Sequence, residues 1–135
     1  MPAYNFKKQF VPMIISGEKP HTIRARRKRP TKVGDRLMLY TGLRTKNAFM
    51  FAFSVCEKIE PVIIYPTIRE IMVNGNLLSA SKTLSLAKAD GFETVSDFFE
   101  FFKKTYKEYE LDNFEIIYWS LEALTVCYAE GNNAS

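Results

Sequence analysis

The sequence predicts an α+β fold in which short strands are flanked by several helices. Apolar, aromatic and β-branched runs typical of buried strands alternate along the chain with apolar residues at the three- and four-residue spacing of helices. The 135 residues are 47% hydrophobic and 25% charged, as expected for a soluble domain. Neither an internal repeat nor a low-complexity linker divides them. We therefore expect one domain over residues 1–135, with a tail that is disordered from about residue 130.

The first half of the chain is expected to contain one helix among strands. Apolar residues at helical spacing predict a helix over 8–16 that ends at Gly17. Pro12 is compatible with this helix only near its first turn. The sequence Val33-Gly34-Asp35 predicts a turn. Strands are expected at 3–6, 21–25, 36–40, 48–59 and 62–65.

Helical signals return in the second half of the chain. Thr67 and Glu70 have the spacing of a capping box, which predicts a short helix that ends near Asn74-Gly75. Another helix is expected at 84–89, before Gly91.

The clearest helix is expected over 94–107, behind Thr94 as its N-terminal cap. Its apolar residues recur at three- and four-residue spacing, so we expect this largely aromatic face to be core: Val95, Phe98, Phe99, Phe102 and Tyr106. The apolar run at 114–119 predicts a final buried strand.

Positive charge is concentrated in one segment. Residues 19–46 contain ten basic residues and one acidic residue, a net charge of +9. Because the whole chain carries +4, the remaining residues carry −5. Such a concentrated basic segment predicts a polyanionic partner.

Other composition signals exclude several classes of protein. No apolar run approaches the length of a membrane span, and the N-terminal residues lack the apolar core of a signal peptide, so we expect a cytoplasmic protein with no membrane partner. Cys56 and Cys127 stand alone and are expected to be reduced structural thiols. With His21 as the single imidazole, a metal site is not expected, and no cofactor is implied.

A combination of short motifs carries a resemblance to a known family. The motifs are Gly17, Lys19, Thr22-Ile23-Arg24, Val33-Gly34-Asp35 and Ala89-Asp90-Gly91-Phe92 before the aromatic helix. Over about residues 3–119 the chain resembles the ASCH domain family. The resemblance implies a PUA-like fold, which is a small closed β-barrel with flanking helices and a cleft near the Gly17–Arg24 loop. It also implies RNA or a modified nucleoside as partner, since some members resemble amidohydrolases acting on N4-acetylcytidine and others resemble metal-independent ribonucleases.

The spacing of Lys19, Thr22 and Arg24 suggests a chemistry of its own. In an extended turn Lys19 and Thr22 could converge, and the nearby cation and desolvation would favour a neutral amine able to deprotonate a hydroxyl. Thr22 would then be the nucleophile and Lys19 its base, as in the amidohydrolase-like members that the chain resembles. Asp90 matches the position of their acid/base carboxylate, where the family enzyme has Glu. The alternatives are a solvated loop lysine, an ordinary strand threonine and a helix-terminal aspartate. For His21 we expect a solvent-facing or packing role.

The basic residues also predict nucleic-acid contacts. Arg groups bind phosphate oxygens in paired hydrogen bonds, so the run Arg26-Arg27-Lys28-Arg29 is expected to contact RNA or DNA, together with Arg24. Arg44 and Lys46 form a second basic turn, which the fold could bring to the same face. Tyr40 is a weaker candidate for stacking on a base. The alternation of Phe49, Phe51 and Phe53 instead predicts one buried sheet face.

Two functions of different class therefore remain open. The first is an RNA- or nucleotide-binding module that performs no chemistry. The second is a metal-independent hydrolase that acts on acylated nucleosides or on RNA. The sequence does not choose between them, and it leaves the base, the choice of RNA or DNA and the oligomeric state open.

Overall fold

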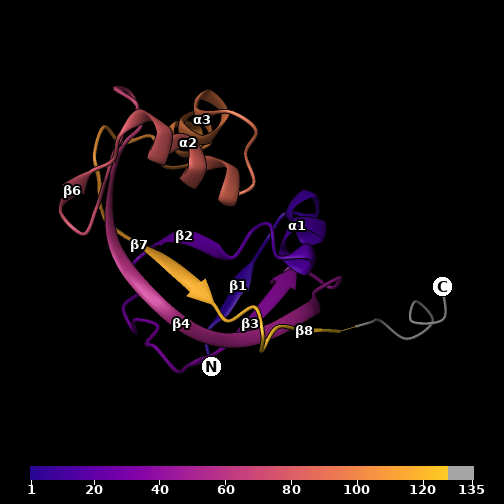
Figure 1. Cartoon of the computed structure of the whole chain (residues 1–135). Coiled ribbons are helices and arrows are strands. Elements are labelled where there is room, and N and C mark those ends of the chain that lie inside the picture. Colours follow the sequence, from indigo (N-terminus) through magenta and orange to yellow (C-terminus); the bar gives the residue numbers. More distant parts are fainter. Residues whose placement is uncertain (128–135) are drawn as a thin grey trace. The chain divides into compact units, whose positions relative to one another are not determined.

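The computed structural model describes residues 1–127, and Figure 1 shows their strands and helices. The described part is an α+β fold with a mixed sheet of eight strands and three α-helices, which confirms the expected class. The tail expected to be disordered from about residue 130 lies outside the described residues. The strands are β1 (Ala3–Asn5), β2 (His21–Ala25), β3 (Arg36–Thr41), β4 (Phe49–Tyr65), β5 (Glu70–Val73), β6 (Asn76–Leu77), β7 (Leu111–Trp119) and β8 (Thr125–Val126).

The sheet is built around the long strand β4. Its first part pairs antiparallel with β3, which pairs in parallel with β1. Its last four residues pair antiparallel with β5, which pairs with β6. Pro61, which has no N–H to donate to a ladder, lies between these two paired parts of β4. The strand β7 pairs with β2 and β4, and β8 pairs with β4.

This sheet is not closed into a barrel within residues 1–127. The strand order begins at β1 and ends at β6, so both ends of the path are open edges. Closure requires each edge strand to find a second neighbour with a matching stagger, and β1 and β6 are only three and two residues long. The closed barrel implied by the ASCH resemblance is therefore wrong for the described residues.

The contacts of the chain divide it into two compact units. The first unit contains residues 1–20 and 31–58 and the segment from 118 onward, and the second contains 21–30 and 59–117. Each unit has its own buried apolar side chains.

The first unit contains the 3-10 helix η1 (Lys8–Phe10) and the helix α1 (Val11–Ser16). Pro12 lies in the first turn of α1, where its missing N–H has no helical partner to lose. Gly17 ends the helix with φ at 88°, a left-handed conformation that a residue with a Cβ rarely adopts. The helix expected at 8–16 is therefore confirmed.

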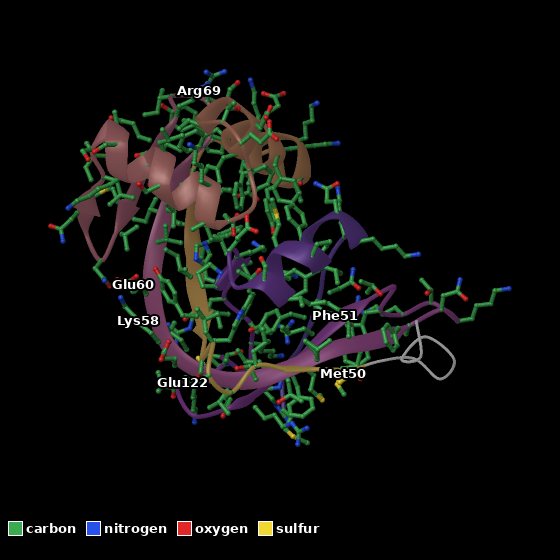
Figure 2. All side chains as sticks on the ribbon, turned by 45° about the vertical axis from the view of Figure 1, so that its right-hand side comes forward. Met50, Phe51, Lys58, Glu60, Arg69 and Glu122 are labelled. Carbon is green, nitrogen blue, oxygen red and sulfur yellow. The ribbon has the colours of Figure 1, made fainter. Side chains whose placement is uncertain are left out.

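A β-bulge changes the expected face of β4. Leu39 pairs with Ala52, but the next residue, Tyr40, pairs with Met50, so Phe51 is an extra residue in β4. Figure 2 labels Met50 and Phe51 on this strand. Phe51 and Ala52 are both buried, whereas Phe49 and Phe53 are half-buried. The prediction that the three alternating phenylalanines share one buried face is therefore wrong, because the bulge interrupts the two-residue period.

A hairpin replaces one predicted helix in the second unit. Asn74 and Gly75 both have positive φ, at 52° and 78°, and connect β5 to β6. Met72 pairs with Leu77 and Val73 with Asn76, as in a two-residue hairpin loop. The helix predicted from Thr67 is wrong because Asn-Gly, the strongest short hairpin signal, outweighs a capping box without an apolar stripe.

The two helices of the second unit lie side by side (Figure 1). They are α2 (Ala80–Ala89) and α3 (Val95–Tyr106), so the helix expected at 84–89 begins earlier than predicted. The Ser79 hydroxyl caps α2 by accepting from the N–H of Lys82, and the Thr94 hydroxyl accepts from that of Asp97. As predicted, the aromatic face of α3 is core, with three fully buried rings: Phe98, Phe99 and Phe102.

Three further findings concern thiols, metals and membranes. Cys56 is buried, Cys127 is half-buried, and both are free thiols. In the described part of the chain, no three His, Cys, Asp or Glu side chains gather closely enough to hold a metal ion. None of the helices within residues 1–127 is long and apolar enough to cross a membrane.

Candidate functional site

Polar side chains are buried along β2, in the second unit. His21 is 1% exposed and Thr22 3% exposed, whereas Arg24 is half-buried. Side chains two residues apart lie on the same face of a strand, and Arg24 Nε donates a hydrogen bond of 2.9 Å to Thr22 Oγ1. Buried polar groups are costly without partners, so the hydrogen bond from Arg24 offsets part of the cost of burying Thr22.

The helix α2 brings a carboxylate to β2. Asp90 caps the C-terminal end of α2, where its backbone N–H donates to the carbonyl oxygen of Leu86 at 2.9 Å. Its side chain is nearly buried, and Oδ1 lies 3.3 Å from Nε2 of His21. Asp90 therefore occupies the helix-terminal position considered from the sequence and also contacts the imidazole. His21 is buried, so a solvent-facing role is excluded.

Tyr106 is a member of this group that the sequence placed only in the aromatic core. Its ring stacks on Phe102 at 16° and meets Phe114 edge-on at 4.8 Å between centroids. Burial raises the pKa of Tyr106, the positive charge of Arg24 lowers it, and the negative charge of Asp90 raises it. The phenol thus lies in the electrostatic field of both groups. Tyr106 is the last residue of α3 and is only half-buried, unlike the three buried rings before it. A polar aromatic residue at the end of an apolar helix face is the signal that could have identified it as a site residue.

We call these five residues the β2 polar cluster: His21, Thr22, Arg24, Asp90 and Tyr106. All of them belong to the second unit. The cluster combines a hydroxyl, a phenol, a guanidinium, an imidazole and a carboxylate. These groups donate and accept hydrogen bonds in the way required to recognise a nucleobase or a nucleoside.

Lys19 lies in the first unit, whereas Thr22 and Asp90 lie in the second. Lys19 is only 3% exposed, so the alternative of a solvated loop lysine is wrong. Its backbone N–H donates to the carbonyl oxygen of Met13 at 2.9 Å, and Nζ lies 5.2 Å from the centre of the Phe10 ring. The ring face attracts the ammonium group and offsets part of its burial. The convergence of Lys19 and Thr22 remains a prediction.

The basic loop, residues 26–29, follows β2 directly and belongs to the same unit. Its first residue is fixed to β7, because the backbone N–H of Arg26 donates to the carbonyl oxygen of Asn113 at 2.8 Å. All four side chains are exposed: Arg26, Arg27, Lys28 and Arg29. Exposed guanidinium and ammonium groups on an anchored loop suit contacts with phosphate.

The other predicted nucleic-acid contacts lie in the first unit. Arg44 and Lys46 are exposed in a tight turn, in which the N–H of Thr45 donates to the carbonyl oxygen of Gly42 at 3.0 Å. Tyr40 is half-buried on β3, and its carbonyl oxygen accepts from the N–H of Phe6 at 2.8 Å. These residues are therefore described separately from the basic loop, and a shared face with it remains a prediction.

The comparisons with known proteins add no identification. No protein-family model matches this chain, and comparisons with curated proteins and with solved structures find no significant match. Only the residues of the site itself therefore indicate a function.

Proposed function

We propose that this chain is an RNA- or nucleotide-binding protein of the ASCH type. The basic loop would contact phosphates, and the β2 polar cluster would contact the base or nucleoside. One observation carries the proposal: four consecutive exposed cations follow, without a break in the unit, a strand whose polar side chains are buried. The open sheet does not support the closed PUA-like barrel, so the family assignment is proposed from the sequence motifs alone.

The exposed loop suits affinity for a polyanion. Each phosphate that a Lys or Arg neutralises releases counterions, which makes binding favourable at moderate salt and weaker at high salt. Side chains that stay in water lose little hydration until the phosphate arrives. The loop therefore supports binding that depends on charge and little on base sequence.

The buried cluster suits selectivity. Arg24 and Asp90 carry opposite charges and shift the pKa of Tyr106 in opposite directions, Arg24 downward and Asp90 upward. A site built from desolvated polar groups rejects a ligand that leaves them unpaired. A nucleobase supplies planar edges with both donors and acceptors, which is the ligand chemistry that such a cluster would favour.

The test is the salt dependence of RNA affinity after neutralisation of the basic loop. Replacing Arg26, Arg27, Lys28 and Arg29 together by Ala should weaken binding of a labelled single-stranded RNA and reduce the salt slope by about one per lost phosphate contact. The matched control removes four exposed lysines elsewhere in the second unit: Lys82, Lys88, Lys103 and Lys104. This control has the same net charge as the loop variant, so an equal loss in both variants would exclude a specific phosphate role for the loop.

A second candidate is a metal-independent hydrolase acting on N4-acetylcytidine-type nucleosides or on RNA. The burial of Lys19, Thr22 and Asp90, each less than 5% exposed, favours it, since Lys and Asp are rarely buried without a special role. Thr22 Oγ1 accepts from Arg24, so its own proton remains available for transfer to a base. In this proposal the Thr22 hydroxyl attacks the acyl carbonyl and Lys19 takes its proton. The C–N bond then breaks as the proton passes by way of Asp90 to the leaving amine, and water hydrolyses the ester left on Thr22.

Turnover assays separate the two candidates. The parent protein is incubated with N4-acetylcytidine and, separately, with RNA in the presence of a chelator. If Lys19 is the base, both Lys19→Ala and Lys19→Arg should abolish hydrolysis, because a guanidinium does not lose its proton at accessible pH. Hydrolysis that survives Lys19→Arg would contradict the lysine base, and an inactive parent protein that binds RNA would leave the binding function alone.

A further inference from the structure

We propose that His21 is a positioning residue, which holds the carboxylate of Asp90 in place within the β2 polar cluster. This inference rests on the proposed function, because it assigns Asp90 to the ligand site. The observation behind it is a contact between two side chains that are far apart in the sequence: Nε2 of His21 lies 3.3 Å from Oδ1 of Asp90, and both side chains are nearly buried.

The position of Asp90 makes a partner necessary. The C-terminal end of a helix carries partial negative charge from its last carbonyl groups, so a carboxylate there is electrostatically unfavourable. Asp90 is the C-terminal cap of α2 and is only 4% exposed, so water screens this repulsion poorly. An imidazole at 3.3 Å supplies a polar group, positive when protonated, on the side of the carboxylate that faces β2.

The same contact joins the C-terminal end of α2 to β2. His21 directly precedes Thr22 on β2, and successive side chains of a strand lie on opposite faces. His21 thus contacts the helix-borne carboxylate, while Thr22 and Arg24 are joined by their hydrogen bond on the other face. The negative charge of Asp90 also raises the pKa of Tyr106, so the carboxylate acts electrostatically on this phenol. Loss of the imidazole would remove the contact that His21 makes with this carboxylate.

The first experiment needs no ligand. His21 is the only histidine of the chain, so its ring signals in a long-range proton–nitrogen NMR spectrum require no assignment. We expect Asp90→Asn to shift these signals clearly. The matched control is Asp112→Asn, which changes an exposed carboxylate on β7 in the same unit and should leave them in place. Ring signals that do not respond to Asp90→Asn would overturn the proposal.

The second experiment is a double-mutant cycle on the affinity for a fluorescein-labelled single-stranded RNA. His21→Leu and Asp90→Asn should each weaken binding by about tenfold, and the double variant should lose little more, because His21 acts through Asp90. His21→Gln, which keeps a side-chain N–H, should restore most of the affinity. Losses that multiply to about a hundredfold in the double variant would show two independent effects and overturn the positioning role.

The controls keep this inference distinct from the proposed function. Thermal unfolding of each variant shows whether it folds, and if His21→Leu does not, His21→Ala replaces it in the cycle and should lose affinity only when Asp90 is intact. A parent protein that binds neither the RNA nor N4-acetylcytidine would overturn the proposed function. The ring signals of His21 would still decide whether the imidazole holds Asp90.

Discussion

The strand β2 and the basic loop that follows it are neighbours in sequence and belong to the same unit, yet their polar side chains differ in exposure to water. In β2 the side chains of His21 and Thr22 are withdrawn from water; the imidazole lies 3.3 Å from the Asp90 carboxylate, and the Thr22 hydroxyl accepts from Arg24. In the loop the side chains of residues 26–29 are all exposed. The same short segment therefore contains a preorganised polar site and a solvated charged surface.

A count of basic residues along the sequence therefore overstates how much positive charge one surface carries. The ten basic residues between 19 and 46 divide equally between the two units, five in each. One of them, Lys19, is buried. Charge on the exposed loop acts over about a Debye length and, in the proposed function, would contribute to affinity. Buried polar groups act at contact distance and would contribute to selectivity.

The largest effect is expected where burial in this unit is complete. Phe98 is fully buried on α3, so the stability lost on its truncation is the reference for the smaller losses expected in β2. Phe98→Ala should lower the free energy of unfolding by about 3–5 kcal/mol, since it removes ring contacts and leaves a cavity. Chemical denaturation measures this loss, and a value below about 1 kcal/mol would mean that the face is not core.

A smaller effect is expected within β2 itself. Thr22→Val keeps the shape of the side chain but removes the acceptor of the 2.9 Å hydrogen bond from Arg24. The free energy of unfolding should fall by about 1 kcal/mol, because water can still reach the half-buried guanidinium. Thr22→Ser, which keeps the hydroxyl, is the control. If both variants lose the same stability, the methyl group rather than the hydrogen bond accounts for the loss.

The alkaline side of the stability profile should report on Tyr106. Its pKa is raised above the ordinary value of 10.0, mainly by burial, so folding favours the neutral phenol. The stability that this phenol contributes is complete below pH 10 and is lost as pH rises from there through the pKa of the folded state. Tyr106→Phe should therefore flatten the fall in unfolding free energy above pH 10 relative to the parent protein. An unchanged fall would contradict a titrating phenol in the cluster.

The smallest effect on stability is expected in the loop. Arg29→Gln removes an exposed charge and should change the free energy of unfolding by less than about 0.5 kcal/mol. Arg24→Gln, made as the counterpart in β2, should cost more, because it disturbs a hydrogen bond to a buried hydroxyl. Thermal and chemical unfolding measure both variants. An equal loss of unfolding free energy in the two would contradict the view that Arg24 is held by a structural hydrogen bond and Arg29 is not.

Much of the secondary structure could be predicted because its signals are local. Gly17 ends α1 with a positive φ, and the Thr94 hydroxyl caps α3, as each residue type suggested. The strand at 21–25 has the predicted bounds. The helix expected from Thr67 is wrong because two local signals competed there, and the Asn74-Gly75 hairpin was the stronger.

The candidate site could be predicted only in part. The motif identified Thr22, Arg24 and Asp90; in the structure Arg24 donates to Thr22, and Asp90 contacts His21. A solvent-facing or packing role was expected for His21 because the sequence contains no second imidazole and no thiol beside it. Its partner, Asp90, is 69 residues away in the chain, and no pattern of short spacing reports such a contact.

The sequence by itself determined the α+β class, the caps and stops of the helices, the aromatic face of α3 and the basic loop after β2. These features depend on side chains within a few positions of one another, through capping bonds, left-handed glycines and the periods of helix and strand. Only the tertiary structure decided the open sheet, the bulge at Phe51, the burial of Lys19 and the contact of His21 with Asp90. Pairing and burial depend on which distant segments meet, and the free energy of burying a polar group is set by the partners it finds there.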